Sequence, residues 1–412
     1  MRKPELLAPA GDFEKLRVAV AYGADAVYLS GTAFGLRAKA KNFNESELAD
    51  GIAYAHKHGV KVYVTANIFA HNSDIDEMSG YFEGLAAMGA DAFIISDPGV
   101  MMMARREAPA VEIHVSTQAN TTNYASASFW HEMGASRVIL ARELSLPEIT
   151  EMRERCPEGL SLEAFVHGAM CMSYSGRCML SKYMSGRDAN LGACAHPCRY
   201  NYRLWAEEVS RPGSFIPVEE DDRGTDIFAA EDLCMMPHLA AMLEAGIGGF
   251  KIEGRMKTVF YVGLAVKAYR QAIDTLFKDS SEYKKKVPDY MEMLKMASHR
   301  PFSTGFYFGD THKGLEASSY SRSHDFVGMV LEYDAKIKCA LVEQRNVFAL
   351  GDVLTFIRPG TQKGLNGDFS QKLIEMSSED GIKLDRAPHA KQRLILPMDE
   401  AVEPLTLVCR EL

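Results

Sequence analysis

The first 255 residues repeat one pattern, in which a helical segment ends in a small-residue turn and leads into a short apolar strand. The repeats read YGADAVYLS (22–30), HGVKVYVTAN (58–67), MGADAFIIS (88–96), MGASRVILA (133–141) and AGIGGFKIEG (245–254). Glycine readily adopts the left-handed conformation that ends a helix, so each repeat predicts a helix, a turn and a strand in that order. A chain that alternates helices and strands builds a parallel sheet.

Three more stretches complete a set of eight predicted strands. They are ELLAP (5–9), EIHVST (112–117) and LEAFVHG (162–168). Eight β/α units predict an α/β fold, a (β/α)8 TIM-like barrel over residues 1–278. An open, doubly wound sheet is the alternative, but no G-x-G-x-x-G fingerprint follows the first strand.

The two faces of the predicted strands differ in chemistry. Apolar residues such as Val62 and Val64 alternate with polar ones, and helices outside the barrel should cover the apolar face. A polar interior indicates a functional site or buried ion pairs, such as Lys251 with Glu163 or Glu253, because an unpaired buried polar group costs about 1–3 kcal/mol. The catalytic candidates on this face are His114, Gln118, Glu163, His167, Lys251 and Glu253. Active sites of this fold lie at the C-terminal strand ends, where Asn67 and Arg255 also fall.

Five of the eight cysteines lie between Cys171 and Cys234, in a predicted insertion at 169–247 before the eighth strand. Their spacing does not match the paired C-x2-C knuckles of a structural zinc site. Four thiolates suit a 4Fe-4S cluster, and zinc is the alternative metal.

The motif EAFVHGAMCMSYSGRCMLS (163–181) resembles the signature of the collagenase-like peptidase (U32-type) family, in particular its prephenate-dependent tRNA uridine hydroxylases. PELLAPAGD, HVSTQANTTN, GRDANLGACAHPCRY and FKIEGRMKT extend the resemblance over about residues 4–275. It implies a 4Fe-4S cluster held by Cys171, Cys178, Cys194 and Cys234. The C-x3-C pair, which would bring in Cys198, is the alternative.

The same resemblance implies hydroxylation of the tRNA wobble uridine, with prephenate as co-substrate. Prephenate has two carboxylates, which arginine binds in bidentate fashion. The expected substrate-binding residues are Arg37, Asn67, Arg142 and Arg255. We expect His114, Glu163 and His167 to move protons and Lys251 to hold an anionic intermediate.

Three other functions remain open at this point: a collagenase-like peptidase, a ribosomal-RNA hydroxylase of the same family, and a non-catalytic cluster-bearing subunit. Against a peptidase, the sequence contains no H-E-x-x-H motif. Against a non-catalytic role stands the polar interior of the predicted barrel. A homologous partner subunit or a homo-oligomer is also compatible with the sequence.

The C-terminal part of the chain has a different pattern. Residues 279–322 include the charge run YKKK and are expected to link two domains. Residues 323–412 alternate short apolar runs with turns, which predicts a small β-barrel domain. It resembles a translation-factor-like barrel, for which RNA binding and packing or dimerisation are both open roles.

Charge and hydropathy limit the remaining possibilities. No apolar run approaches the length of a signal sequence or membrane span, so we expect a cytoplasmic protein without membrane contact. The formal net charge of −9 argues against wholesale coating of nucleic acid, although a local basic patch can still bind RNA.

Overall fold

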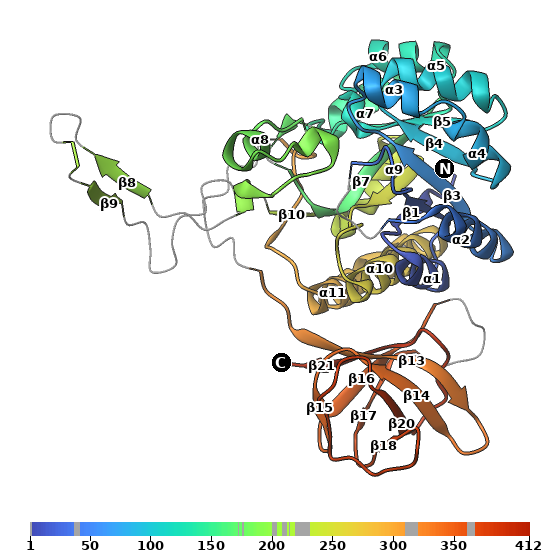
Figure 1. The fold of residues 1–412 in the computed structure, drawn as a ribbon, viewed down its shortest axis with the longest axis vertical. Helices are drawn as coiled ribbons and strands as arrows, with labels where there is room; N and C mark the ends of the chain where they lie inside the picture. The colour runs from blue at the N-terminus through green and yellow to red at the C-terminus, as the bar shows by residue number, and fades with distance from the viewer. Residues whose placement is uncertain are drawn as a thin grey trace.

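The computed structural model describes residues 2–36, 42–171, 173–174, 177–199, 204–207, 212–213, 215–218, 231–309, 320–360 and 367–412. Eight parallel strands form a closed barrel, because the last of them pairs with both the first and the seventh (Figure 1). They are β1 (Glu5–Pro9), β2 (Ala26–Leu29), β3 (Lys61–Ala66), β4 (Ala92–Ile95), β5 (Glu112–Val115), β6 (Arg137–Ile139), β7 (Ser161–Ala169) and β11 (Gly249–Ile252). The predicted TIM-like barrel is confirmed.

Helices surround this barrel. They are α1 (Phe13–Ala21), α2 (Glu45–Lys57), α3 (Asn72–Glu77), α4 (Tyr81–Ala87), α5 (Pro98–Glu107), α6 (Tyr124–Glu132), α7 (Leu146–Arg155), α9 (Leu239–Glu244) and α10 (Val259–Lys278). Side chains such as Asp12 and Asn44 cap their N-termini by accepting bonds from first-turn N–H groups. The glycine in each sequence repeat has the positive φ that a helix stop requires: Gly23, Gly59, Gly89, Gly134 and Gly246.

The insertion between β7 and β11 contains short elements. They are α8 (Leu180–Ser185), the 3-10 turns η3 (Ala189–Leu191), η4 (Pro197–Arg199) and η5 (Met236–His238), and the strands β8 (Leu204–Glu207), β9 (Phe215–Val218) and β10 (Asp232–Cys234). Strand β10 runs antiparallel to β7 and pairs in parallel with β12 (Phe302–Ser303). The insertion therefore extends the barrel sheet beyond its closure.

Residues 279–322, which we expected to be a link, contain the helix α11 (Ser280–Met296). It exposes the three lysines of the YKKK run and buries Tyr283, Tyr290 and Leu294. The hydroxyl groups of Tyr290 and Thr275 are 2.8 Å apart, which ties α11 to α10. This part of the segment belongs to the helical shell.

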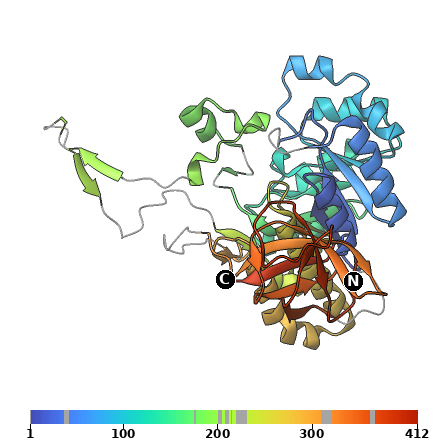
Figure 2. The same cartoon turned by 60° about the horizontal axis from the view of Figure 1, so that its bottom comes forward.

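The C-terminal residues form an antiparallel, curled β domain, as expected. Its strands are β13 (His324–Asp334), β14 (Cys339–Gln344), β15 (Phe348–Ala349), β16 (Val353–Ile357), β17 (Phe369–Lys372), β18 (Ser377–Ser378), β19 (Arg386–Ala387), β20 (Arg393–Pro397) and β21 (Leu407–Glu411). In Figure 1 the domain lies beside α10 and α11, on the opposite side from α8, and in Figure 2 it comes to the front of the molecule. No helix in the described residues is long and apolar enough to cross a membrane.

Candidate active site

A cavity of about 60 Å³ opens at the C-terminal ends of the barrel strands. Its lining comprises Tyr28, Leu36, Thr65, Asn67, Ile94, Ser116, Thr117, Gln118, Ile139, Arg142, Phe165, Lys251, Glu253 and Arg255. Six of the residues selected from the sequence meet here: Asn67, Gln118, Arg142, Lys251, Glu253 and Arg255. They are far apart along the chain, and the barrel brings them together because every parallel strand ends on the same face.

Arg255 lies just beyond β11 and is buried, with 4% of its surface exposed. Its Nη1 atom donates to Thr65 Oγ1 at 3.3 Å and its Nη2 atom to Asn42 Oδ1 at 2.6 Å. These two bonds hold the guanidinium in a fixed orientation. The Arg255 side chain is therefore held in place where it lines the cavity.

Arg142 follows β6 on another side of the cavity. Its Nη2 atom donates to Glu253 Oε2 at 3.1 Å and its Nη1 atom to the Ala169 carbonyl at 3.0 Å. The guanidinium lies 3.9 Å from the centre of the Phe165 ring. These contacts connect the ends of β6, β7 and β11.

The wall formed by β3 and β5 is uncharged. Asn67 Nδ2 donates to Ser116 Oγ at 3.1 Å, and Ser116 precedes the 3-10 turn η1 (Thr117–Ala119), which carries Gln118. Among the described residues, Oε1 of Gln118 is buried without a hydrogen-bond partner. A buried acceptor of this kind is satisfied by a donor from a ligand or a water molecule.

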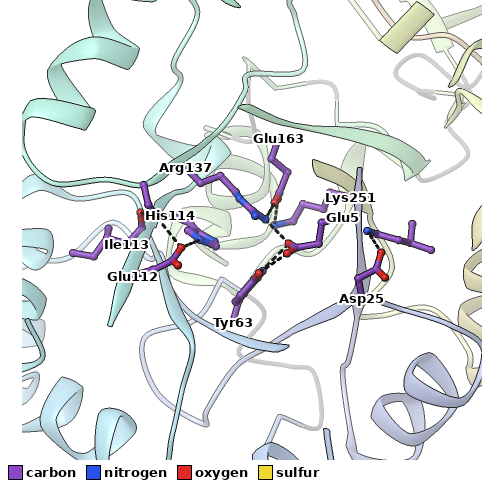
Figure 3. A network of polar contacts seen from close by, with 11 residues as sticks. Glu5, Asp25, Tyr63, Glu112, Ile113, His114, Arg137, Glu163 and Lys251 are labelled. Carbon is purple, nitrogen blue, oxygen red and sulfur yellow. Dashed lines mark hydrogen bonds and ion pairs between the residues drawn. The ribbon is translucent and has the colours of Figure 1, made fainter. Parts of the chain in front are cut away.

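Below the cavity, a charged network occupies the N-terminal half of the barrel (Figure 3). Glu163 is bound by two cations, with Lys251 Nζ at 3.2 Å from Oε1 and Arg137 Nη1 at 2.8 Å from Oε2. Arg137 also pairs with Glu5 at 2.5 Å, and Tyr63 donates to Glu5 at 2.9 Å. The buried ion pair of Lys251 with Glu163 is therefore present.

This network determines the ionisation of its members. Burial raises the pKa of Glu163, but Lys251 and Arg137 outweigh burial and hold that pKa below its usual value. Burial lowers the pKa of Lys251, while the Glu163 carboxylate opposes the shift. Two carboxylates and two cations thus neutralise one another inside the barrel, with Lys251 at the top of the network.

His114 and Glu163 do not line the cavity, although we expected them to move protons there. His114 is buried beside Tyr63, and its Nε2 atom lies 3.3 Å from Glu112 Oε2. Burial lowers the pKa of His114, so its imidazole is neutral near pH 7. Both residues belong to the N-terminal half of the barrel, which in this fold supports stability and not chemistry.

His167 is a correction to the sequence analysis, because its side chain is outside the barrel interior. Its ring packs against Tyr261 and Tyr269 of α10 and against Phe302, with centroids 5.4 to 5.6 Å apart. The pairing of β7 with β11 shifts register between Lys251 and Ile252. Such a bulge reverses the alternation of side chains, so strand parity predicted the wrong face for His167.

The expected metal ligands on the insertion have different environments. Cys171 is exposed, and its Sγ atom accepts a bond from Ser173 N at 3.4 Å. Cys194 is half-buried and accepts likewise from His196 N at 3.4 Å. Cys178 and Cys198 are also half-buried. Thiol sulfur is the type of donor that soft metal ions prefer.

Cys234 is buried on β10, where its Sγ atom lies 3.8 Å from Tyr269 Oη and 3.7 Å from Met291 Sδ. Burial raises the pKa of this thiol to about 11. Within the described residues, no three His, Cys, Asp or Glu side chains are placed to hold a metal ion. The thiol chemistry suits a soft metal, but the sulfur atoms do not converge. Arg37 lies outside the described residues.

Sequence reasoning missed several contributors to the site. Asn42 orients Arg255, and Arg137 with Glu5 supports Glu163 from below. Arg137 and Glu5 each occupy the first position of a strand. Because side chains alternate between the two faces of a strand, counting positions along each strand could have placed both residues in the barrel interior. Asn42 lies in a loop and carried no such signal.

Comparison with known proteins adds independent information. Residues 11–317 match Peptidase family U32, and residues 322–408 match the Peptidase family U32 C-terminal domain. The tRNA hydroxylation protein P1 of Bacillus subtilis (strain 168) is 38% identical, over 99% of this chain and 94% of that protein. The tRNA hydroxylation protein P of Escherichia coli (strain K12) is 35% identical, over 98% and 95%.

A third relative is a considerably longer protein. The 23S rRNA 5-hydroxycytidine C2501 synthase of Escherichia coli (strain K12) is 34% identical over 68% of this chain and 40% of that protein. The first family match covers the barrel, and the second covers the C-terminal β domain. The two relatives of nearly equal length match this chain over both parts. The chain therefore belongs to Peptidase family U32.

Proposed function

We propose that this protein is an RNA hydroxylase that acts on tRNA. The observation that carries the proposal is its similarity, over nearly its full length, to two proteins named for tRNA hydroxylation. The cavity at the barrel mouth supports it, because a modifying enzyme of this fold needs its reacting groups on that face. We further propose C5 of the wobble uridine as the target and prephenate as co-substrate.

The charge of the cavity suits a dicarboxylate. Arg255 presents a guanidinium that Thr65 and Asn42 hold in place, and Arg142 presents a second one from the opposite strands. Such planar donors bind carboxylates through two parallel hydrogen bonds. Lys251 adds a cation at the base of the cavity, and Gln118 Oε1 offers an acceptor for a hydroxyl or an imide N–H group.

These contacts assign different roles to the residues. Arg255 and Arg142 would bind the co-substrate, and Glu253 would position Arg142 through their 3.1 Å ion pair. Asn67 and Gln118 would orient the substrate, and Lys251 would stabilise negative charge that develops during the reaction. Glu163 positions Lys251, and its contact with two cations leaves it no role in proton transfer at the mouth.

We also propose a 4Fe-4S cluster on Cys171, Cys178, Cys194 and Cys234, with Cys198 as the alternative to Cys234. Four thiols on one insertion provide suitable donors. The burial of Cys234 against Tyr269 does not fit ligation as it stands, so we assign the cluster no catalytic step. Iron analysis of anaerobically purified protein tests this: Cys178→Ser should lose iron and Cys339→Ser should keep it.

Peptidase activity is the competing function that the family description suggests. Among the described residues that line the cavity, neither cysteine nor histidine is present. The described lining thus offers no cysteine or serine nucleophile with an adjacent histidine base. This favours hydroxylation over peptide hydrolysis.

The proposed function is tested by mass spectrometry of nucleosides from a strain that lacks the gene. We expect 5-hydroxyuridine derivatives to disappear from tRNA and to return with the wild-type gene but not with Arg255→Ala. Unchanged tRNA with altered 23S ribosomal RNA would transfer the assignment to ribosomal RNA. Unchanged nucleosides in both RNAs would contradict the proposal.

A further inference from the structure

Large apolar side chains are concentrated on the surface of one short part of the insertion, which we call the rim segment (residues 174 and 177–191). Tyr183 is 89% exposed, Met179 66% and Tyr174 56%, and Met184 and Leu191 are exposed as well. Side chains of this size are normally exposed singly, so a group of five within one segment points to a binding surface.

The exposure of these side chains is a consequence of ordered local structure. Ser181 lies on the inner side of α8, fully buried, where Oγ donates to the Arg187 carbonyl at 2.7 Å and accepts from Ala195 N at 2.9 Å. Met179 and Tyr183 are one helical turn apart, so they share a face. With Ser181 held against the insertion, that face is directed to solvent.

The rim segment borders the cavity. Arg177 Nη2 donates to the Gln118 carbonyl at 3.2 Å, and Gln118 itself lines the cavity. Asn120 Nδ2 donates to the Tyr174 carbonyl at 3.4 Å, which attaches the segment to the end of β5. On the β3 side, Phe69 N donates to the Asn190 carbonyl at 3.3 Å.

The charge of this region is opposite in sign to that of the whole protein. The rim segment includes three basic side chains, Arg177, Lys182 and Arg187, and one acidic side chain, Asp188, whereas the chain has a formal net charge of −9. Arg177 also lies 5.2 Å from the centre of the Phe69 ring. Cations next to exposed aromatic rings are the combination that binds single-stranded nucleic acid.

We infer that the rim segment is a stacking platform for unpaired bases of the RNA substrate, with Tyr183 and Tyr174 as its principal rings. The inference rests on the proposed function. It adds a binding surface for RNA outside the cavity. A base must leave its stack to enter a site inside a barrel, and rings at the entrance compensate the lost stacking. The basic residues attract the adjacent phosphates.

RNA fits this surface better than a second protein chain does. The two most exposed rings of the segment are tyrosines, and Lys182 precedes Tyr183 directly in the chain. The Tyr174 carbonyl is bonded to Asn120, and Arg177 is bonded to the Gln118 carbonyl next to the cavity. A base presents its flat face to such rings whatever its sequence, which suits an anticodon loop with several unpaired bases. A protein partner would instead bury the apolar face and be insensitive to ring chemistry.

The test measures binding of unmodified total tRNA and of an unstructured oligoribonucleotide by fluorescence anisotropy at fixed salt. Tyr183→Ala and Tyr174→Ala should each weaken binding about tenfold, the effect of losing one base stack. Tyr183→Phe should bind as wild type, and Tyr183→Leu should bind like Tyr183→Ala because leucine has no aromatic face. Phe277→Ala, at the far end of α10, is the matched control and should bind normally.

The outcomes separate this inference from the proposed function. If wild-type protein hydroxylates and binds tRNA while Tyr183→Ala and Tyr174→Ala bind it equally well, the platform is refuted and the function stands. If wild-type protein neither binds nor modifies RNA, the function itself fails. If Tyr183→Ala binds RNA as the wild type does but sediments with a smaller mass, the rim segment is a protein interface. That result also overturns the platform. Melting curves confirm that each variant is folded.

Discussion

Single residues at the barrel mouth combine burial with charge, and Arg255 shows how this is achieved. Its guanidinium is buried but oriented by the neutral oxygens of Thr65 and Asn42. Glu163 shows the opposite arrangement, in which one buried carboxylate is shared by Lys251 and Arg137. Arg255 is thus held in a fixed orientation at the cavity, and Glu163 is neutralised by two cations.

Replacing Arg255 should therefore affect the co-substrate more than the fold. If it binds a carboxylate of prephenate, Arg255→Ala should lose about 1.5–3 kcal/mol, or roughly tenfold to a hundredfold in apparent affinity. Arg255→Lys should recover only part, since lysine lacks the two-pronged geometry. Titrating RNA hydroxylation with prephenate measures this. A stable Arg255→Ala protein with unchanged apparent affinity would exclude the carboxylate contact.

Removing the charge of Glu163 should destabilise the protein strongly. Glu163→Gln leaves Lys251 and Arg137 close together in the barrel, and breaking a buried ion pair costs about 3–5 kcal/mol. Chemical denaturation measures the free energy of unfolding. Glu292→Gln, whose side chain is 72% exposed, is the control and should change stability little. Equal stability of both variants would show that the network is not needed for folding.

At the scale of elements, the bulge between β7 and β11 decides which side chains face the cavity. Gly168 follows His167 with φ of 112°, and a Cβ atom there would lie 2.4 Å from the Glu253 carbonyl oxygen. The chain can therefore approach β11 this closely only at glycine. As a result, Glu163 and Phe165 of β7 face the barrel interior, whereas His167 faces α10.

This placement predicts a pH dependence of stability. Burial lowers the pKa of His167 from 6.5 to about 3, so below pH 6.5 the unfolded chain binds a proton that the folded protein does not. The free energy of unfolding should then fall by about 1.4 kcal/mol per pH unit towards the folded pKa. His167→Phe should lack this component in denaturation curves between pH 6.5 and 4. Exposed His71→Phe is the control, and equal slopes for wild type and His167→Phe would contradict the assignment.

At the scale of the whole molecule, the barrel and the C-terminal domain share a buried interface. Leu407, Ile357 and Met329 of the β domain belong to the same apolar core as α1 and α10. The Tyr22 hydroxyl donates to the Ile357 carbonyl at 2.6 Å and accepts from Leu407 N at 3.2 Å. Arg345 pairs with Glu14 across the same interface. The two parts are thus expected to unfold as one unit.

Tyr22→Phe tests this coupling. It leaves buried backbone groups of Ile357 and Leu407 unsatisfied, which should lower the free energy of unfolding by about 1–3 kcal/mol. Calorimetry should still show one transition, at a lower temperature. Tyr54→Phe, on the half-buried surface of α2, should melt as wild type does. Two separate transitions in the wild-type protein would show that the domains are independent.

Much of this architecture followed from local sequence. The repeated helix, glycine and strand predicted the barrel, because glycine C-caps and strand alternation depend only on neighbouring residues. Strand alternation selected Asn67, Gln118, Lys251 and Arg255, and Arg142 was selected as an arginine that follows the sixth strand; all of them line the cavity because parallel strands end on one face. For that reason the sequence alone predicts at which end of the barrel the cavity lies.

Only the tertiary structure decided how these side chains pair and which way they point. Glu163 combines with Lys251 and Arg137, and His167 turns away from the cavity, because strand register and one bulge join residues far apart in sequence. The exposure of Tyr183 depends on Ser181 being held beneath α8 by residues further along the insertion. Local pattern determines which elements form, whereas long-range packing determines what each side chain meets.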